Sequence, residues 1–85
     1  MEFDIVYSDE ARKALEKLSP QVRTRIILTV ERCKARPFAF TRRLVGSKYY
    51  RLRVGDYRVI VDIKQKELVI LVIVVGKRDA IYSSI

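Results

Sequence analysis

The segment YYRLRVGDYRVIV, residues 49–61, alternates apolar and polar side chains on both sides of Gly55-Asp56. This pattern predicts two antiparallel strands joined by a two-residue turn. Such a turn sets Arg53 opposite Arg58. Side chains of a strand alternate between faces, so one face should carry Tyr50, Leu52, Val54, Tyr57, Val59 and Val61, and the other Arg51, Arg53 and Arg58.

The predicted opposition of two arginines is unusual, because like charges directly opposite each other destabilise a sheet. Folding alone gives no reason for the pair, whereas an anionic partner does. Arginine can bind a phosphate through two parallel hydrogen bonds. The arginine face is therefore predicted to bind phosphate.

The positive charge of the chain is concentrated in its middle. The 85 residues have a formal net charge of +8, and residues 32–64 carry ten basic and two acidic side chains, whereas residues 1–31 carry five basic and six acidic. This localisation favours a binding surface, although a solvated basic surface is the alternative. The length predicts a single domain, residues 1–85.

The elements before this segment predict a strand and a helical hairpin. Residues 3–7 alternate as a strand, and Ser8 can cap a helix over residues 9–18. Ser19-Pro20 is a second start signal, for a helix that should end near Ala35 because Pro37 follows. Residues 38–48 show little periodicity, and Phe38 and Phe40 should anchor them on the core.

The remaining pattern predicts a meander of three strands, at residues 49–54, 57–64 and 67–75. Gln65-Lys66 should form the second turn and set Lys64 against Glu67, and Gly76 should end the third strand. That strand is apolar on both faces and should be central or covered. The fold class is α+β, with the helical hairpin on one sheet face. The edge that the first strand joins stays open.

The sequence lacks the residues that several classes of binding site and enzyme require. The chain has no histidine and one cysteine, so a zinc site is not expected, and Cys33 falls in line with core positions. No glycine-rich phosphate loop occurs, and no cofactor is expected. The longest apolar run, residues 68–75, is too short to span a membrane. We expect a cytoplasmic protein.

Arginine, lysine and tyrosine remain, and they suit RNA cleavage. The 2′-hydroxyl of RNA is an internal nucleophile beside the phosphate, so positioning and electrostatics supply much of the rate. DNA lacks this hydroxyl group. Arginines can stabilise the charge that builds in the transition state, and tyrosine can stack on a base or move a proton.

At this point the chain resembles the RelE toxins of the RelE/ParE toxin–antitoxin superfamily, and is similar to archaeal forms. The resemblance rests on residues 49–60, on VGKRDAIY at 75–82, on FDIVYS at 3–8, on LEKLSP at 15–20 and on Leu44-x-Gly46. It implies a ribosome-dependent endoribonuclease that cuts mRNA in the ribosomal A site without metal, leaving a 2′,3′-cyclic phosphate. It also implies a RelB-like antitoxin, which charge complementarity predicts to be partly acidic.

The resemblance assigns roles by position. Arg58 matches the arginine that holds the scissile phosphate, Arg78 the arginine that stabilises the transition state, and Tyr82 a tyrosine that stacks on the substrate or acts as general base. Arg51 and Arg53 lie where some members carry lysines. Arginine does not lose its proton, so these two can only act electrostatically.

Arg42, Arg43, Lys48 and Lys77 are expected to contact RNA. Two other functions stay open, and fold alone cannot separate them. One is a ParE-like toxin that inhibits DNA gyrase without cutting RNA. The other is a non-catalytic RNA-binding module.

Overall fold

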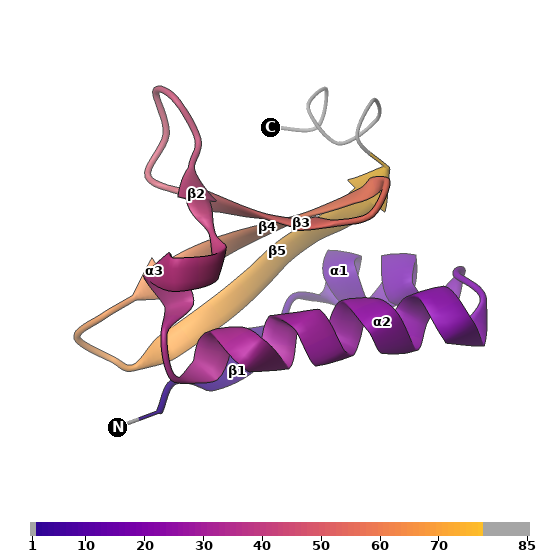
Figure 1. Cartoon of the computed structure of the whole chain (residues 1–85), viewed down its shortest axis with the longest axis horizontal. Helices are drawn as coiled ribbons and strands as arrows, with labels where there is room; N and C mark the ends of the chain where they lie inside the picture. Colours follow the sequence, from indigo (N-terminus) through magenta and orange to yellow (C-terminus); the bar gives the residue numbers. More distant parts are fainter. Residues whose placement is uncertain (1, 78–85) are drawn as a thin grey trace.

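The structure, a computed structural model, describes residues 2–77 and has the expected α+β architecture. Its strands form one sheet in the order β1-β5-β4-β3-β2, and α1 and α2 lie against one face (Figure 1). The elements are β1 (Asp4–Tyr7), α1 (Asp9–Glu16), α2 (Pro20–Glu31), the 3-10 turn η1 (Arg32–Lys34), α3 (Pro37–Phe40), β2 (Arg42–Arg43), β3 (Tyr50–Val54), β4 (Tyr57–Lys64) and β5 (Val69–Lys77).

The first strand joins the sheet beside the last one. β1 runs parallel to β5, with Asp4 opposite Val69 and Tyr7 opposite Val72. β5 consequently has a neighbour on each side, which agrees with its apolar character on both faces. This arrangement settles the edge that the sequence left open.

Both predicted helix caps are present. The Ser8 Oγ accepts a hydrogen bond from the Ala11 N–H at 3.0 Å and donates one to the Ile73 carbonyl at 2.8 Å, so the cap also ties α1 to β5. The Ser19 Oγ accepts from the Val22 N–H at 3.4 Å. α1 ends at Glu16, earlier than predicted.

Arg23 of α2 donates hydrogen bonds to backbone carbonyl groups at the C-terminal end of α1. Its guanidinium donates to the carbonyl oxygens of Leu15, Glu16 and Leu18 at 2.9, 3.2 and 3.0 Å. The last carbonyls of a helix lack part of their intrahelical bonding, and the Leu15 carbonyl here also accepts from the Leu18 N–H at 3.1 Å. Arg23 therefore joins the two helices at their tight connection.

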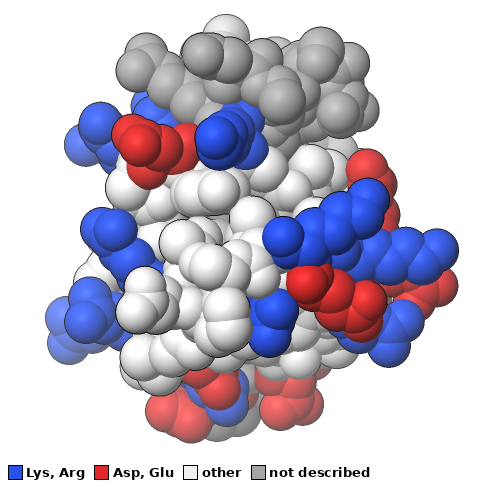
Figure 2. Space-filling view, turned by 90° about the vertical axis from the view of Figure 1, so that its right-hand side faces the viewer, with Lys and Arg blue, Asp and Glu red and all other residues white. Residues whose placement is uncertain are grey.

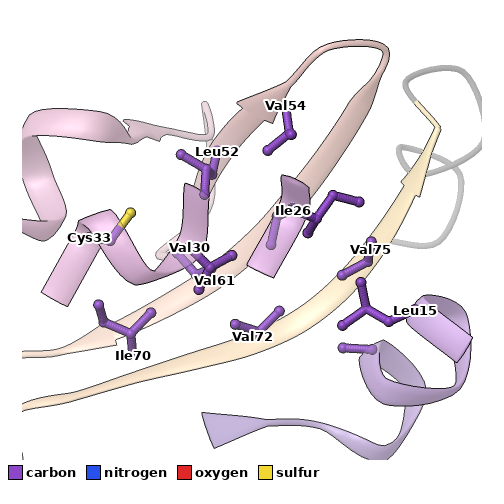
Figure 3. Close-up of a cluster of buried hydrophobic side chains, with 12 residues drawn as sticks. Leu15, Ile26, Val30, Cys33, Leu52, Val54, Val61, Ile70, Val72 and Val75 are labelled. Atoms are coloured by element: carbon purple, nitrogen blue, oxygen red, sulfur yellow. The ribbon is translucent and has the colours of Figure 1, made fainter. Parts of the chain in front are cut away.

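The core lies between the helices and the inner face of the sheet (Figure 3). The inner-face residues of the predicted hairpin all contribute to it, and Ile26 and Val30 of α2 pack on them. Cys33 is a core residue as predicted, and burial raises the pKa of its thiol to about 11. No helix within residues 2–77 combines the length and apolar character needed to cross a membrane.

Residues 38–48 have more structure than their sequence pattern predicts. Pro37 begins the short helix α3, and Arg42–Arg43 form β2, which pairs with β3 and adds an antiparallel strand to the meander. The loop from Leu44 to Tyr49 then rises from the sheet (Figure 1). A two-residue strand is too short to show periodicity in the sequence. β2 is a strand because it pairs with β3.

β5 also differs from prediction. The turn before it spans four residues, Gln65–Leu68, so Lys64 lies opposite Val69 and not opposite Glu67. Gly76 does not end the strand but continues it, opposite Arg58. Glycine weakens a strand, but the pairing with β4 keeps Gly76 within β5.

Candidate phosphate-binding site

The register of the sheet places four arginines in two opposed pairs. Arg53 of β3 lies opposite Arg58 of β4, as the turn at Gly55-Asp56 predicted. Arg42 of β2 lies opposite Arg51 of β3, and this second pair was not predicted. Each pair is repulsive on a sheet, which strengthens the case for an anionic partner.

Arg58 is buried, with 5% of its surface exposed, although the sequence predicted an outward-looking arginine. Its Nη1 donates to the carbonyl oxygens of Gly55 at 3.3 Å and Tyr57 at 3.2 Å. Gly76, its neighbour on β5, brings no side chain to this face. The turn thus holds the guanidinium through carbonyl oxygens, and no carboxylate within residues 2–77 forms an ion pair with it.

The two arginine pairs share one cavity of about 120 Å³. Its lining consists of Phe40, Arg42, Arg51, Arg53 and Arg58, here called the arginine cavity. Concentrated guanidinium groups bind phosphate and can stabilise negative charge that develops on it. Arginine stays protonated at all working pH values, so this cavity acts through charge and hydrogen bonds.

The other basic residues lie apart from the arginine cavity. Arg43 points into the β2–β3 loop, where its Nε donates to the Ser47 carbonyl at 3.0 Å. The Lys48 Nζ lies 5.5 Å from the centre of the Tyr49 ring. Lys77 is exposed at the end of β5. Of the four residues expected to contact RNA generally, Arg42 alone joins the predicted catalytic arginines.

Two predicted site residues, Arg78 and Tyr82, lie outside the described residues 2–77. Their roles therefore stay predictions.

Sequence reasoning missed two neighbours of the site. Phe40 was expected to anchor the core but is 49% exposed and lines the arginine cavity. Arg25 of α2 reaches the β3–β4 turn, because a Cβ atom on Gly55 would lie 3.1 Å from its Nη1. Glycine is also favoured there by a φ of +58°. Neither contact has a signal in the sequence, because each depends on packing between elements.

Charge is not uniform over the molecule. Figure 2 shows one side, on which acidic and basic side chains together surround a broad uncharged area. Within residues 2–77, no group of three or more histidine, cysteine or acidic side chains is placed to hold a metal ion. The functional groups gathered at the arginine cavity are therefore cations and one aromatic ring.

Comparison with known proteins identifies the family. Residues 5–82 match the model of the ParE toxin of the type II toxin–antitoxin system parDE. No curated protein matches the chain.

Solved structures of RelE toxins share the fold. RelE of the archaeal RelE–RelB complex from Pyrococcus horikoshii is 26% identical, with 94% of this chain and 99% of that chain covered and a TM-score of 0.80. A mutant of the E. coli toxin RelE in the free state is also 26% identical, with 99% and 93% covered and a TM-score of 0.80. The RelBE2 complex from Mycobacterium tuberculosis matches at 18% identity, with 92% and 100% covered and a TM-score of 0.82, which speaks for the fold. The chain therefore belongs to the ParE toxin family of type II toxin–antitoxin systems, within the RelE/ParE superfamily.

Proposed function

We propose that this toxin is an mRNA endoribonuclease that acts in the ribosomal A site and blocks translation in the cytoplasm. The observation that carries the proposal is the arginine cavity, in which two like-charged cross-strand pairs converge on one space. A bound anion would offset this repulsion. RNA supplies both the anion and an internal nucleophile.

The proposed reaction is attack of a ribose 2′-oxygen on the adjacent phosphorus. The new P–O2′ bond forms as the P–O5′ bond breaks, which leaves a 2′,3′-cyclic phosphate and a 5′-hydroxyl. Arg58, held by the turn carbonyls, would bind the phosphate and stabilise its developing charge. Arg51 and Arg53 would add charge from β3.

Proton transfer needs another group, because arginine keeps its proton. The 2′-hydroxyl must lose a proton and the leaving oxygen must gain one. Tyr82 or the ribosome would serve, and Arg78 would add a further charge, as the resemblance implies. A metal is not required in this scheme, since the chain has no histidine, one cysteine and no clustered carboxylates among residues 2–77.

The toxin would be neutralised by a RelB-like antitoxin. The similar toxins from Pyrococcus horikoshii and E. coli were solved as complexes with RelB. A partly acidic antitoxin would complement the net charge of +8.

Inhibition of DNA gyrase is the second candidate function, and the match to the ParE family favours it. Such a toxin needs no cleavage site, so the opposed arginines would have to bind a protein or DNA instead. A non-catalytic RNA-binding module would keep RNA binding without cleavage.

One experiment compares the three functions. Purified toxin is added to ribosomes translating a defined mRNA, the 5′ ends of fragments are mapped by primer extension, and gyrase supercoiling is assayed in parallel. We expect cuts that require ribosomes and normal supercoiling. Inhibited supercoiling without cuts would support the gyrase function, and co-sedimentation of the toxin with the ribosomes without cuts would support the RNA-binding module.

A metal series tests the metal-independent scheme separately. Cleavage is followed in Mg²⁺, Ca²⁺ and Mn²⁺ at concentrations that keep the ribosomes intact. We expect similar rates. An order that follows the Lewis acidity of the metal would contradict the scheme.

A further inference from the structure

α3 presents two phenylalanines of similar exposure in different surroundings. Phe38 is 43% exposed and Phe40 is 49% exposed. The Phe38 ring meets the Tyr50 ring edge-on, with centroids 5.2 Å apart, and Tyr50 packs on the core. Phe40 instead lines the arginine cavity. One ring thus attaches α3 to the sheet, while the other borders the candidate site.

The backbone on both sides of Phe40 is anchored. Before it, Pro37 is buried and its carbonyl accepts a hydrogen bond from the Thr41 Oγ1 at 2.8 Å. After it, β2 pairs with β3 through Arg42 opposite Arg51. The segment between these anchors is short, so the position of Phe40 follows from the fold and not from its own burial.

Core packing does not explain why residue 40 is aromatic. Burial of a phenylalanine stabilises a fold in proportion to the apolar area removed from water, and Phe40, at 49% exposed, forgoes about half of it. A single exposed apolar residue is ordinary, but this one lies beside four arginines. Aromatic rings next to backbone-binding cations are the arrangement with which proteins hold single-stranded RNA.

We infer that Phe40 is a stacking platform for the nucleobase next to the phosphate in the arginine cavity. The inference rests on the proposed function, because it takes single-stranded RNA as the ligand. Guanidinium groups bind the phosphate whatever the base, whereas a ring contact requires a base. Phe40 would therefore be the part of the cavity that detects a nucleobase, and the arginines the part that detects charge.

The test compares a uridine hexaribonucleotide with an abasic ribose-phosphate hexamer of equal charge. Binding of each fluorescently labelled oligomer to the toxin at low salt is measured by anisotropy. The variants are Phe40→Leu, which removes the ring, Phe40→Tyr, which keeps it, and Phe38→Leu, the matched change on the same helix. Thermal unfolding of each variant checks that the fold is intact.

The wild-type protein should bind the base-bearing oligomer more tightly, by roughly fivefold to a hundredfold, as expected for one stacked base. Phe40→Leu should remove this preference by weakening binding of the base-bearing oligomer to the level of the abasic one. Phe40→Tyr and Phe38→Leu should retain it, although Phe38→Leu should lower the unfolding temperature.

Three results would overturn the inference. They are equal binding of both oligomers by the wild-type protein, binding of neither, and an undiminished preference in Phe40→Leu. None of them decides whether translated mRNA is cut, because the primer-extension assay measures that independently. If the wild-type toxin did not cut translated mRNA but Phe40→Leu still lost the preference for the base-bearing oligomer, the proposed enzyme would be contradicted. The inference that Phe40 stacks on a base would still hold.

Discussion

The inner and outer faces of β3 and β4 come from alternate residues of the same two strands and have opposite energetics. On the inner face, Leu52 and Val59 lie opposite each other, are almost fully buried, and belong to the main core. On the outer face, Arg53 lies opposite Arg58. Burial of apolar side chains stabilises the fold, whereas opposed like charges destabilise it. The inner face therefore carries the main core. The outer face is divided: the arginines are arranged for a ligand, while Ile60 of β4 is buried in a second apolar cluster with Val74.

Arg58 and Val59 are consecutive residues of β4, point to opposite faces and are both buried. Val59 is surrounded by the apolar core. Arg58 is a cation removed from most of the solvent, with carbonyl oxygens as its hydrogen-bond acceptors. A charge already removed from water and fixed in place interacts more strongly with an incoming anion. Burial therefore does not distinguish a core position from a site position in this sheet.

Truncating a side chain that packs on the inner face should give the largest effect. Ile26→Ala removes a fully buried side chain of α2 from the core, and should lower the free energy of unfolding by about 2–5 kcal/mol. Leu28→Ala on the same helix is the control, because Leu28 is 58% exposed. Urea titration measures both. Equal losses would mean that α2 does not pack on the sheet through the face that carries Ile26.

Removing the buried cation should affect activity more than stability. Arg58→Ala should lower ribosome-dependent cleavage by roughly a hundredfold or more, as for loss of one transition-state contact. The free energy of unfolding should change by less than about 1 kcal/mol, because lost hydrogen bonds are offset by relief of the repulsion from Arg53.

Val59→Ala is the matched control for Arg58→Ala. It should lower the free energy of unfolding by about 2 kcal/mol and leave the cleavage rate of the folded protein unchanged. Cleavage by primer extension and unfolding in urea are measured on both variants. Full cleavage by Arg58→Ala would refute its place in the site.

A smaller effect on RNA binding should distinguish Arg42 from Arg43, the adjacent arginines of β2. Arg42→Gln should weaken binding to single-stranded RNA and reduce the salt slope by about 0.7, the value for one phosphate contact, because Arg42 lines the arginine cavity. Arg43→Gln is the matched control and should change binding less, since its guanidinium contacts Ser47 in the loop. Anisotropy titrations over a series of salt concentrations measure both slopes. A larger loss of binding in Arg43→Gln than in Arg42→Gln would mean that RNA binds at the β2–β3 loop and not in the arginine cavity.

The smallest effect concerns two ionisable groups of the main core, Tyr7 and Cys33, at alkaline pH. Burial, with smaller contributions from Glu31 and Cys33, raises the pKa of Tyr7 from 10.0 to about 12, and burial raises the pKa of Cys33 from 9.0 to about 11. The folded state then holds protons that the unfolded state has lost. Stability should therefore fall as pH rises from about 9 to about 12.

Urea unfolding at a series of pH values measures this decline. The double variant Tyr7→Phe, Cys33→Ala should show a shallower decline than the wild-type protein, because neither replacement ionises. Lysine ionisation is common to both proteins and serves as the internal control. An identical decline in both would contradict the contribution of these two groups.

The elements with strong local patterns were predictable from the sequence. Ser8 and Ser19 cap the two helices, and the alternation about Gly55-Asp56 fixed the register of β3 with β4. β2 was not predictable, because two residues carry no period. The turn before β5 was also mispredicted, since Leu68 adopts a positive φ of 54° that its residue type disfavours.

The candidate site likewise has features that were predictable from the sequence and features that were not. The opposition of Arg53 and Arg58 follows from local alternation and turn geometry, so it was predictable from the sequence, as were the fold class and the residues of the inner face. Tertiary structure alone decided that Arg42 and Phe40 join the arginine cavity, that Arg25 reaches the turn, and that Arg58 is buried. The physical reason is that a strand pattern fixes which way a side chain points, whereas burial and neighbours depend on elements that are distant in sequence.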